Sequence, residues 1–391
     1  MYTLQAPCHF GIESVLKREI TDLGLEIKDV TDGRVRFFGD AAAIARANIY
    51  LRTPNRILLE VGYFKARTFD QLFEAVKACP WEDYLPADAK FWVTKATSVK
   101  SKLFSTTDIQ RIVKKAIVER LKNKYQTDWF KEDGADYPIR VFINKDMVTV
   151  ALDTSGEALS RRGYRKSTAK APIAENLAAA LILLTPWHAD RILVDPFCGS
   201  GTIPIEAAMI AADQAPGLER EFTSQNWQNL IPKKVWYEVS NEAYDRAETG
   251  LAKLREIDPD IQGYDIDPKM VAFAKENAKR AGLEEFIHFQ TREVKDLNHR
   301  KKYGFIITNP PYGERLEDLE SLPSLYQTIG ERYRALDSWS AYVITSYEDA
   351  PKDMGLKATK NRKIYNGMIK TYFYQFMGPK PPKRKALEEQ N

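Results

Sequence analysis

The chain has 391 residues, of which 44% are hydrophobic and 29% charged, and its net charge is +4. At roughly 150 residues per domain this length predicts two or three globular domains. The longest apolar runs, such as 177–184, are far shorter than the roughly 18 residues of a membrane span, and the start lacks a secretion-signal pattern, so we expect a cytoplasmic protein.

The cysteines, the histidines and the distribution of charge bear on disulfides, metal sites and RNA binding. Cys8, Cys79 and Cys198 are odd in number and far apart, which argues against a disulfide framework, and the four histidines lack metal-ligand spacing, so we predict no metal. Residues 1–170 hold 29 Lys and Arg against 22 Asp and Glu, an excess of +7, whereas the remainder holds 29 against 32. A basic first half is compatible with RNA binding, but the excess is mild.

The first element expected is a helix over GIESVLKREITDLG, whose apolar residues form one stripe and which stops at Gly24. VTDGRVRFFGD then predicts a hairpin that turns at Asp32 and Gly33. We therefore expect residues 1–66 to form a small ferredoxin-like domain with an antiparallel sheet.

A second unit is predicted over residues 67–165. A strand over 89–99 leads into the basic loop KSKLFSTTD, and Thr107 or Asp108 is expected to cap the next helix. The helix has an apolar face and a basic face, although a basic face is often only solvated. A hairpin around Lys145 and Asp146 follows.

The stretches ATSVKSKLFSTTDIQRIVKKAI and VALDTSGEALSRRGYR resemble the THUMP domain, an RNA-binding module of RNA-modifying enzymes. The resemblance implies an RNA partner. The candidate RNA contacts are Lys100, Lys102, Lys114 and Lys115, and a second group lining the passage between the halves is Arg161, Arg162 and Arg165.

From Ala171 onward the pattern becomes strand, Gly-rich turn and helix, repeated, which predicts an α/β domain over residues 166–378. An insertion rich in Trp and charge interrupts it at about 213–256, and residues 379–391 form a basic tail that we expect to be disordered. The overall fold class is therefore α/β, with an α+β region in front.

LVDPFCGSGT places a buried strand before a glycine turn. Gly201 is followed by Thr202 and Ile203 and not by Lys-Ser, which excludes a P-loop, and Pro204 is too large for a dinucleotide fingerprint. The remaining pattern resembles motif I of class I S-adenosylmethionine methyltransferases. This resemblance implies a Rossmann-like methyltransferase domain. It also implies that S-adenosylmethionine contacts Asp195, Phe197, Gly199, Gly201 and Thr202, with glycines that let the backbone approach the ligand.

GYDIDP ends the next strand with Asp265, placed to accept hydrogen bonds from ribose hydroxyls, with Ile266 beside it and Asp267 as a helix cap. The acid expected to read the adenine amino group is Glu293, where the resembled family usually has Asp, and Asp296 is the alternative. Residues 170–182, KAPIAENLAAALI, either close the cofactor pocket or only begin a capped helix.

GFIITNPPYGERL runs a buried strand into Asn309, Pro310, Pro311 and Tyr312. Proline lacks an N–H group, so this tip offers acceptors only, and it fixes Asn309 in an extended conformation. An exocyclic amino group is a matching donor: the Asn309 oxygen and the Pro310 carbonyl can each accept one N–H, and Tyr312 can stack on a planar base. The resemblance to S-adenosylmethionine methyltransferases also implies that Asn309 contacts the cofactor. Glu314 and Arg315 either contact RNA or close the loop.

The motif does not distinguish adenine N6, guanine N2 or a glutamine amide. Three neighbouring features help to discriminate: GERL after the motif, RRGYRKSTAKAPIAENLAAAL before the α/β domain, and the THUMP-like front. Together they resemble bacterial 23S rRNA guanine-N2 methyltransferases from about residue 1 to 378, which implies N2 methylation of a flipped-out guanine. Guanine-N2 methylation of tRNA, protein glutamine methylation and a non-catalytic ribosome assembly factor remain alternatives.

Overall fold

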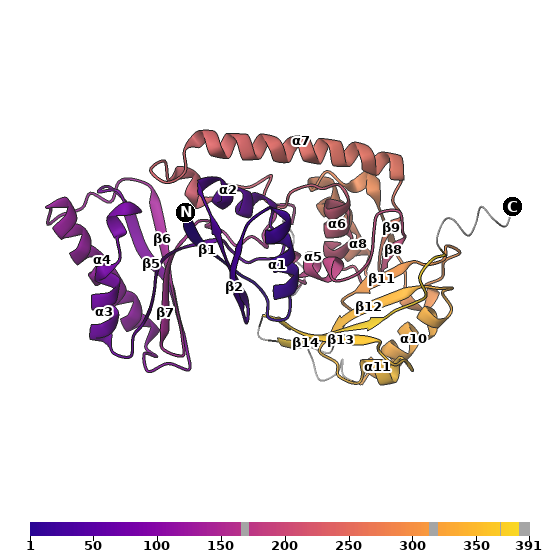
Figure 1. Cartoon of the computed structure of the whole chain (residues 1–391). Helices are drawn as coiled ribbons and strands as arrows, with labels where there is room; N and C mark the ends of the chain where they lie inside the picture. Colours follow the sequence, from indigo (N-terminus) through magenta and orange to yellow (C-terminus); the bar gives the residue numbers. More distant parts are fainter. Residues whose placement is uncertain (166–171, 313–319, 368, 383–391) are drawn as a thin grey trace. The chain divides into compact units, whose positions relative to one another are not determined.

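The computed structural model describes residues 1–165, 172–312, 320–367 and 369–382 (Figure 1). Residues 170 and 171 of the KAPIAENLAAALI segment, Glu314, Arg315 and the tail from 383 lie outside these ranges. The chain divides into two compact units: unit 1 contains residues 1–8, 16–159 and 217–242, and unit 2 contains 9–15, 160–216 and 243–391. No helix in the described part of the chain is both long and apolar enough to cross a membrane.

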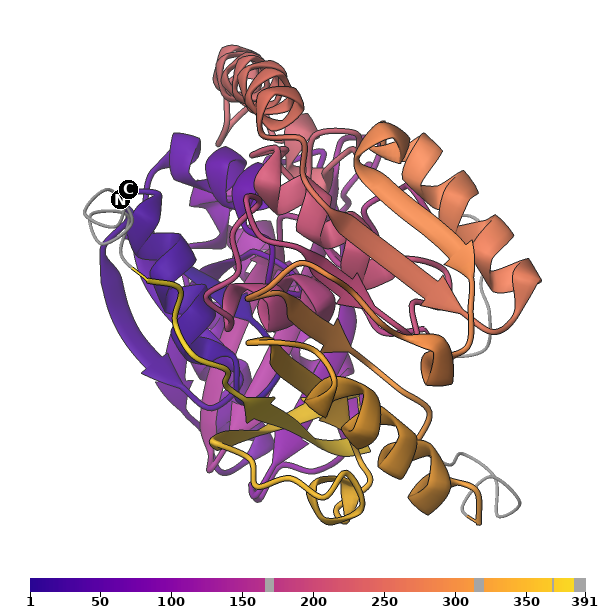
Figure 2. The same ribbon diagram turned by 90° about the vertical axis from the view of Figure 1, so that its right-hand side faces the viewer.

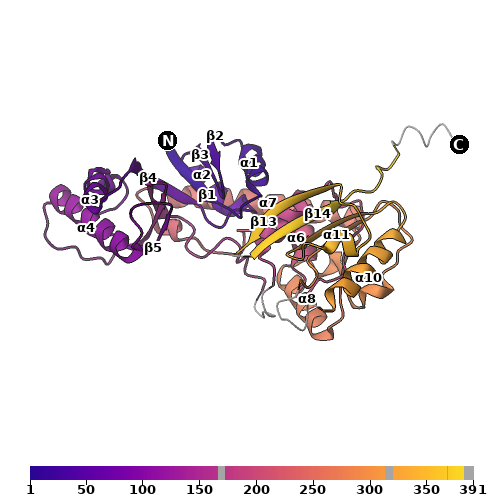
Figure 3. The same cartoon turned by 90° about the horizontal axis from the view of Figure 1, so that it is seen from below.

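Unit 1 is built on one sheet with the strand order β2-β3-β1-β4-β7-β6-β5. Its strands are β1 (Tyr2–Pro7), β2 (Ile27–Thr31), β3 (Arg34–Gly39), β4 (Leu58–Lys65), β5 (Lys90–Val99), β6 (Asp136–Asn144) and β7 (Met147–Asp153). Its helices are α1 (Glu13–Asp22), whose first turn is assigned to unit 2, α2 (Ala41–Tyr50), α3 (Phe69–Ala78), α4 (Thr106–Tyr125) and the short η1 (Trp81–Asp83) and η2 (Thr223–Asn226). Strands from both predicted front domains thus share one sheet, and α3 and α4 pack side by side (Figure 3).

Both predicted hairpins form, and their turns have the required backbone. Gly33 joins β2 to β3 with φ +71°, and Lys145 and Asp146 join β6 to β7 with φ of +51° and +64°. In the second turn, positive φ at both central residues gives a twist that matches the flanking strands, whereas in the first turn Gly33 has positive φ and Asp32 does not. The local sequence signals were therefore sufficient to predict both hairpins.

The N-terminal cap of α4 differs from the predicted one. Ser105 is the capping residue: its hydroxyl accepts a hydrogen bond from the Asp108 backbone N–H at 3.4 Å. Thr107 and Asp108 lie inside the first turn, and Asp108 accepts from the Ser105 hydroxyl at 2.7 Å. An acid is stabilising in the first turn because of the helix dipole, which is why this residue also resembled a cap.

The predicted insertion is divided between the two units. Residues 217–242 pack within unit 1, where Trp227 stacks on Tyr137 with ring centroids 4.8 Å apart and donates from Nε1 to the Asp136 carbonyl at 2.8 Å. Asn229 accepts from the Tyr137 hydroxyl at 2.7 Å. Trp227 is completely buried, so this segment is part of the core of unit 1.

Unit 2 contains the second sheet, with the strand order β10-β9-β8-β11-β12-β14-β13. Its strands are β8 (Leu193–Asp195), β9 (Ile261–Asp265), β10 (Ile287–Thr291), β11 (Phe305–Thr308), β12 (Ser340–Thr345), β13 (Lys360–Asn366) and β14 (Ile369–Phe376). Its helices are α5 (Glu175–Leu183), α6 (Thr202–Ala211), α8 (Pro268–Arg280), α10 (Leu322–Arg334), α11 (Ala350–Asp353), η3 (Glu284–Phe286) and η4 (Val294–Asp296). Helix α7 (Lys233–Ile257) supplies residues 243–257 to this unit.

Five strands of this sheet are parallel. At one edge β14 runs antiparallel to β12, and β13 pairs antiparallel with β14. Helices cover both faces (Figure 2). Helices α6 and α8 pack beside β8, β9 and β10, whereas α10 and α11 pack on the face that carries Val194, Ile306 and Val343. The predicted Rossmann-like α/β class of this half is confirmed, and the carboxyl ends of its parallel strands are where such folds bind ligands.

Candidate active site

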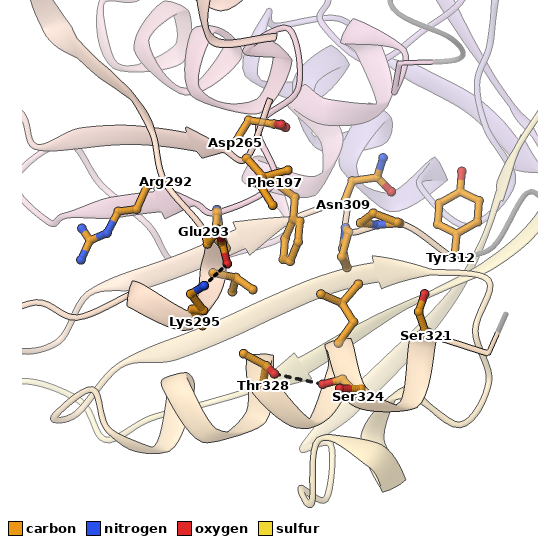
Figure 4. A pocket seen from close by; sticks show the side chains of 16 residues that line it. Phe197, Asp265, Arg292, Glu293, Lys295, Asn309, Tyr312, Ser321, Ser324 and Thr328 are labelled. Atoms are coloured by element: carbon orange, nitrogen blue, oxygen red, sulfur yellow. Dashed lines mark hydrogen bonds and ion pairs between the residues drawn. The ribbon is translucent and has the colours of Figure 1, made fainter. Parts of the chain in front are cut away.

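A cavity of about 720 Å³ opens at the carboxyl ends of β8, β9, β10 and β11. Figure 4 shows that its lining comes from the strand ends on one side and from α10 on the other. Eight predicted site residues line it: Phe197, Asp265, Ile266, Glu293, Asn309, Pro310, Pro311 and Tyr312. Predicted site residues at the ends of four different strands therefore meet at one place.

The glycine turn joins β8 to α6 and is held by its backbone conformation. Gly199 and Gly201 have φ of +52° and +86°, which disfavours other residues. A Cβ atom on Gly201 would lie 2.9 Å from the Phe289 ring and 3.0 Å from the Ala274 Cβ. This differs from the expected reason for a glycine, because the space beside Gly201 is occupied by the protein's own core and not left for a ligand.

Asp265 connects the glycine turn to the second βα unit. Its Oδ2 accepts from the Gly199 N–H at 3.0 Å, and its Oδ1 accepts from the Asp267 N–H at 2.9 Å. Burial raises the pKa of Asp265, while these backbone donors lower it. Asp267 caps α8 as predicted, accepting from the Lys269 N–H at 2.8 Å. Asp265 both orders the turn and faces the cavity.

Asp195 has a different environment from the predicted one. Its carboxyl is buried and does not line the cavity, so direct contact with a ligand there is not what the structure shows. Asp195 Oδ1 accepts from the Thr308 hydroxyl at 2.6 Å and from the Phe197 N–H at 3.1 Å. Burial raises the pKa of Asp195 to about 7. Because Thr308 directly precedes Asn309, this hydrogen bond fixes the glycine turn to the strand tip.

The strand tip itself is open to the cavity. Asn309 is half-buried and, within the described residues, its carboxamide has no hydrogen-bond partner. Pro311 is exposed, and its carbonyl accepts weakly from the Tyr326 hydroxyl at 3.4 Å. Tyr326 is buried and shares a second hydrogen bond of 2.7 Å with the Thr345 hydroxyl, so α10 and β12 brace the tip. Within the described residues, neither the Asn309 carboxamide oxygen nor the Pro310 carbonyl accepts a hydrogen bond.

The cavity also has lining residues that the sequence reasoning missed. Lys295 forms an ion pair of 2.5 Å with Glu293, so the carboxylate expected at adenine is already partnered in this structure. Arg292 directly precedes Glu293 and Lys295 follows it by two positions, so their closeness in sequence could have indicated a partner for this carboxylate. Three hydroxyls also face the cavity from the start of α10 and along it, at the helical spacing of Ser321, Ser324 and Thr328.

Comparison with known proteins identifies the family. Residues 162–375 match the family described as RMKL-like, methyltransferase domain, residues 66–153 match the THUMP domain, and residues 3–58 match the RlmL ferredoxin-like domain. The chain belongs to this methyltransferase family. The predicted resemblance to THUMP-containing RNA methyltransferases is thereby confirmed.

Three relatives show how much of the chain is shared. "Putative RNA methyltransferase YpsC" of Bacillus subtilis is 47% identical, over 99% of both chains. The ribosomal RNA large subunit methyltransferase K/L of Syntrophotalea carbinolica is 37% identical over 94% of this chain, and the chain spans about half the length of that relative, 52%. A crystal structure of "SMU.472, a putative methyltransferase complexed with SAH" is 42% identical, with a TM-score of 0.90 over 97% of this chain and 99% of that one.

In this methyltransferase the basic residues predicted to contact RNA fall into two groups. In unit 1, Lys100, Lys102 and Lys115 are exposed, whereas Lys114 is half-buried, pairs with Glu132 at 3.0 Å and lies 3.6 Å from the Phe91 ring centroid. Lys114 therefore has structural contacts already.

Of the three arginines predicted to contact RNA in unit 2, two already make contacts within the unit. Arg162 is buried and pairs with the buried Glu206 on α6 at 3.3 Å, which is not the predicted RNA contact. Arg165 donates to the Thr202 hydroxyl at 2.8 Å, so it and Thr202 brace the start of α6 and neither lines the cavity. Only Arg161 of this group is exposed.

The described residues contain no group of three or more His, Cys, Asp or Glu side chains that could hold a metal ion.

Proposed function

We propose that the chain transfers a methyl group to the N2 amino group of a guanine in RNA, with 23S rRNA as the foremost substrate. The observation that carries the proposal is the strand tip of Asn309 and Pro310, which offers free acceptors at the wall of the cavity. The family match to RMKL-like methyltransferases and the K/L relatives support the choice of RNA.

The cavity fits S-adenosylmethionine as the cofactor. Its volume lies in the range of small-molecule sites, about 300 to 1,000 Å³, and its lining combines the apolar side chains of Phe197 and Ile266 with the carboxylate of Asp265. Asp265 would hold the ribose hydroxyls, and Glu293 would hold the adenine amino group. When bound, S-adenosylmethionine supplies the methyl group. The relative whose crystal structure contains SAH is consistent with this cofactor.

The residues of the chain act on the amino group of the base. The lone pair of an exocyclic nitrogen is delocalised into the ring, which makes it a weak nucleophile. An Asn309 Oδ1 and a Pro310 carbonyl that each accept one N–H favour the pyramidal nitrogen, because preorganised acceptors stabilise the charge that develops there. Tyr312 can stack on the base, a contact worth about 1 to 3 kcal/mol. The surplus proton leaves to water or to the same acceptors.

We further propose that exposed basic residues hold the RNA backbone while the target nucleotide is flipped into the cavity. Flipping costs a few kcal/mol, and phosphate contacts offset it. Lys100, Lys102 and Lys115 of unit 1 remain in this proposed set, and Arg161 of unit 2 joins them. We leave Arg162 out because its guanidinium is buried against Glu206.

The experiment is a comparison of RNA nucleosides from a strain in which the gene is deleted and from its parent. We expect mass spectrometry of separated 23S rRNA to show loss of one N2-methylguanosine, which the wild-type gene restores and Asn309→Ala does not. Loss of the nucleoside from tRNA alone would assign the activity to tRNA. An unchanged nucleoside content, with no S-adenosylmethionine binding by calorimetry, would favour a non-catalytic assembly factor.

A further inference from the structure

The segment that closes the second sheet is unusually basic. Residues 354–382 contain six Lys and Arg and no Asp or Glu. Most of this segment forms β13 and β14, which pair antiparallel along their length (Figure 3). A stretch without acidic residues attracts anions along its whole length, because no neighbouring carboxylate on the same strands offsets its charge.

The register of the hairpin places two lysines and two tyrosines on one face. Lys363 lies directly opposite Tyr372, and Tyr365 lies opposite Lys370. Directly opposed residues of an antiparallel pair point to the same side, as do residues two apart. Lys363, Tyr365, Lys370 and Tyr372 therefore alternate charge and ring in both directions, and we call them the Lys–Tyr face.

Contacts within the Lys–Tyr face keep the rings and the ammonium groups together. Lys363 Nζ lies 5.1 Å from the Tyr365 ring centroid, and Lys370 Nζ lies 4.9 Å from that of Tyr372. Lys370 also pairs with Glu348 at 2.7 Å, whereas Lys363 is exposed and has no acidic partner among the described residues. Lys363 is therefore the ammonium group most available to a phosphate.

The outer half of the hairpin extends past the edge of the sheet where the cavity opens. The last residue of β12, Thr345, is paired with Tyr372, so β14 continues beyond the carboxyl end of β12 with Thr371, Lys370 and Ile369. The carboxyl end of β11, which leads into Asn309, lies at the same edge because β11 and β12 are parallel. Three strand spacings separate β11 from β13, about 14 Å.

We infer that the Lys–Tyr face is an RNA-contacting surface of the catalytic unit and that it takes the single-stranded nucleotides beside the flipped target. Alternating cations and rings match the alternation of phosphate and base in a single strand, since lysine holds the phosphate and tyrosine stacks on any base. The inference rests on the proposed function for the identity of its ligand. It adds a surface within unit 2 to the basic residues of unit 1.

The test uses the full chain and 23S rRNA isolated from the deletion strain, with binding measured at several salt concentrations. We expect Lys363→Gln to lower the slope of log affinity against log salt by about 0.7, the value for one phosphate contact on a single strand, and Lys363→Arg to keep it. We expect Tyr365→Leu to weaken binding at least about fivefold and Tyr365→Phe to retain it, since the ring and not the hydroxyl stacks. Lys275→Gln, at an exposed lysine of α8, is the matched control and should change neither quantity.

Calorimetry of S-adenosylmethionine binding checks that each variant keeps its active site, and all variants should match the wild type. Unchanged affinity and salt slope in Lys363→Gln and Tyr365→Leu would overturn the inference, as would a wild-type chain that does not bind this RNA. The proposed function is judged separately by nucleoside analysis. If nucleoside analysis shows no methylation of 23S rRNA while the variants still weaken RNA binding, the RNA-contacting surface is supported and the proposed reaction is rejected.

Discussion

Replacing Asp195 with asparagine should remove a pH dependence from the stability of this methyltransferase. The Asp195 carboxyl is completely buried between the glycine turn and the strand that leads to Asn309, and burial raises its pKa from the ordinary 3.8 to about 7. Asparagine has nearly the same shape and its oxygen can accept from Thr308, but it does not ionise. The perturbation therefore changes charge while preserving the packing.

The direction in which stability changes with pH follows from the raised pKa of Asp195. Because the folded state holds the Asp195 proton more tightly than the unfolded chain, its contribution to stability is complete below about pH 4 and is lost as the pH rises towards 7. The whole difference between the two pKa values corresponds to about 4 kcal/mol, of which about 3 kcal/mol falls between pH 5 and pH 8. The stability of Asp195→Asn relative to the wild type should therefore rise by about that amount over this interval.

The assay is denaturant unfolding of both proteins across this pH range, with the difference between them as the readout, because all other titrating groups cancel. Thr308→Val is the matched variant: the Thr308 hydroxyl favours the ionised carboxyl, so removing it should raise the pKa of Asp195 further and move the loss of stability to higher pH. Parallel pH profiles for wild type and Asp195→Asn would refute the reasoning.

Three further substitutions test the proposed catalytic residue Asn309, the glycine turn and the buried ion pair of unit 2. Asn309→Ala should lower methyl transfer at least about a hundredfold, as for loss of one preorganised hydrogen-bonding group, and weaken S-adenosylmethionine binding by calorimetry far less; equal loss of both would contradict the assigned role. Gly201→Ala should destabilise the fold by about 1 to 3 kcal/mol in urea unfolding, because Gly201 has φ +86° and its Cβ would meet Phe289; a variant as stable as the wild type would show that the turn adapts. Glu206→Gln should cost about 3 to 5 kcal/mol in the same assay because it removes the carboxylate that pairs with the buried Arg162 guanidinium, and a cost below about 1 kcal/mol would show that the pair is dispensable.

The sequence by itself determined the parts of this protein that local patterns encode. Positive-φ turns at Gly33 and at Lys145-Asp146, the cap at Asp267 and the order of the glycine turn, Asp265 and Asn309 were all readable, because each depends on residues within a few positions of one another. The rule that ligands bind at the carboxyl ends of parallel strands then brought the three motifs to one cavity.

Tertiary structure alone decided which residues meet across the chain. Asp195 bonds Thr308 over 113 positions, Arg162 pairs with Glu206 inside unit 2, and residues 217–242 complete the core of unit 1. No local sequence pattern distinguishes a buried arginine from an exposed one that can bind RNA, because the difference depends on whether a carboxylate distant in sequence packs against it. For the same reason the Lys–Tyr face emerged only from the pairing of β13 with β14, which sets charge beside ring on one side of the hairpin.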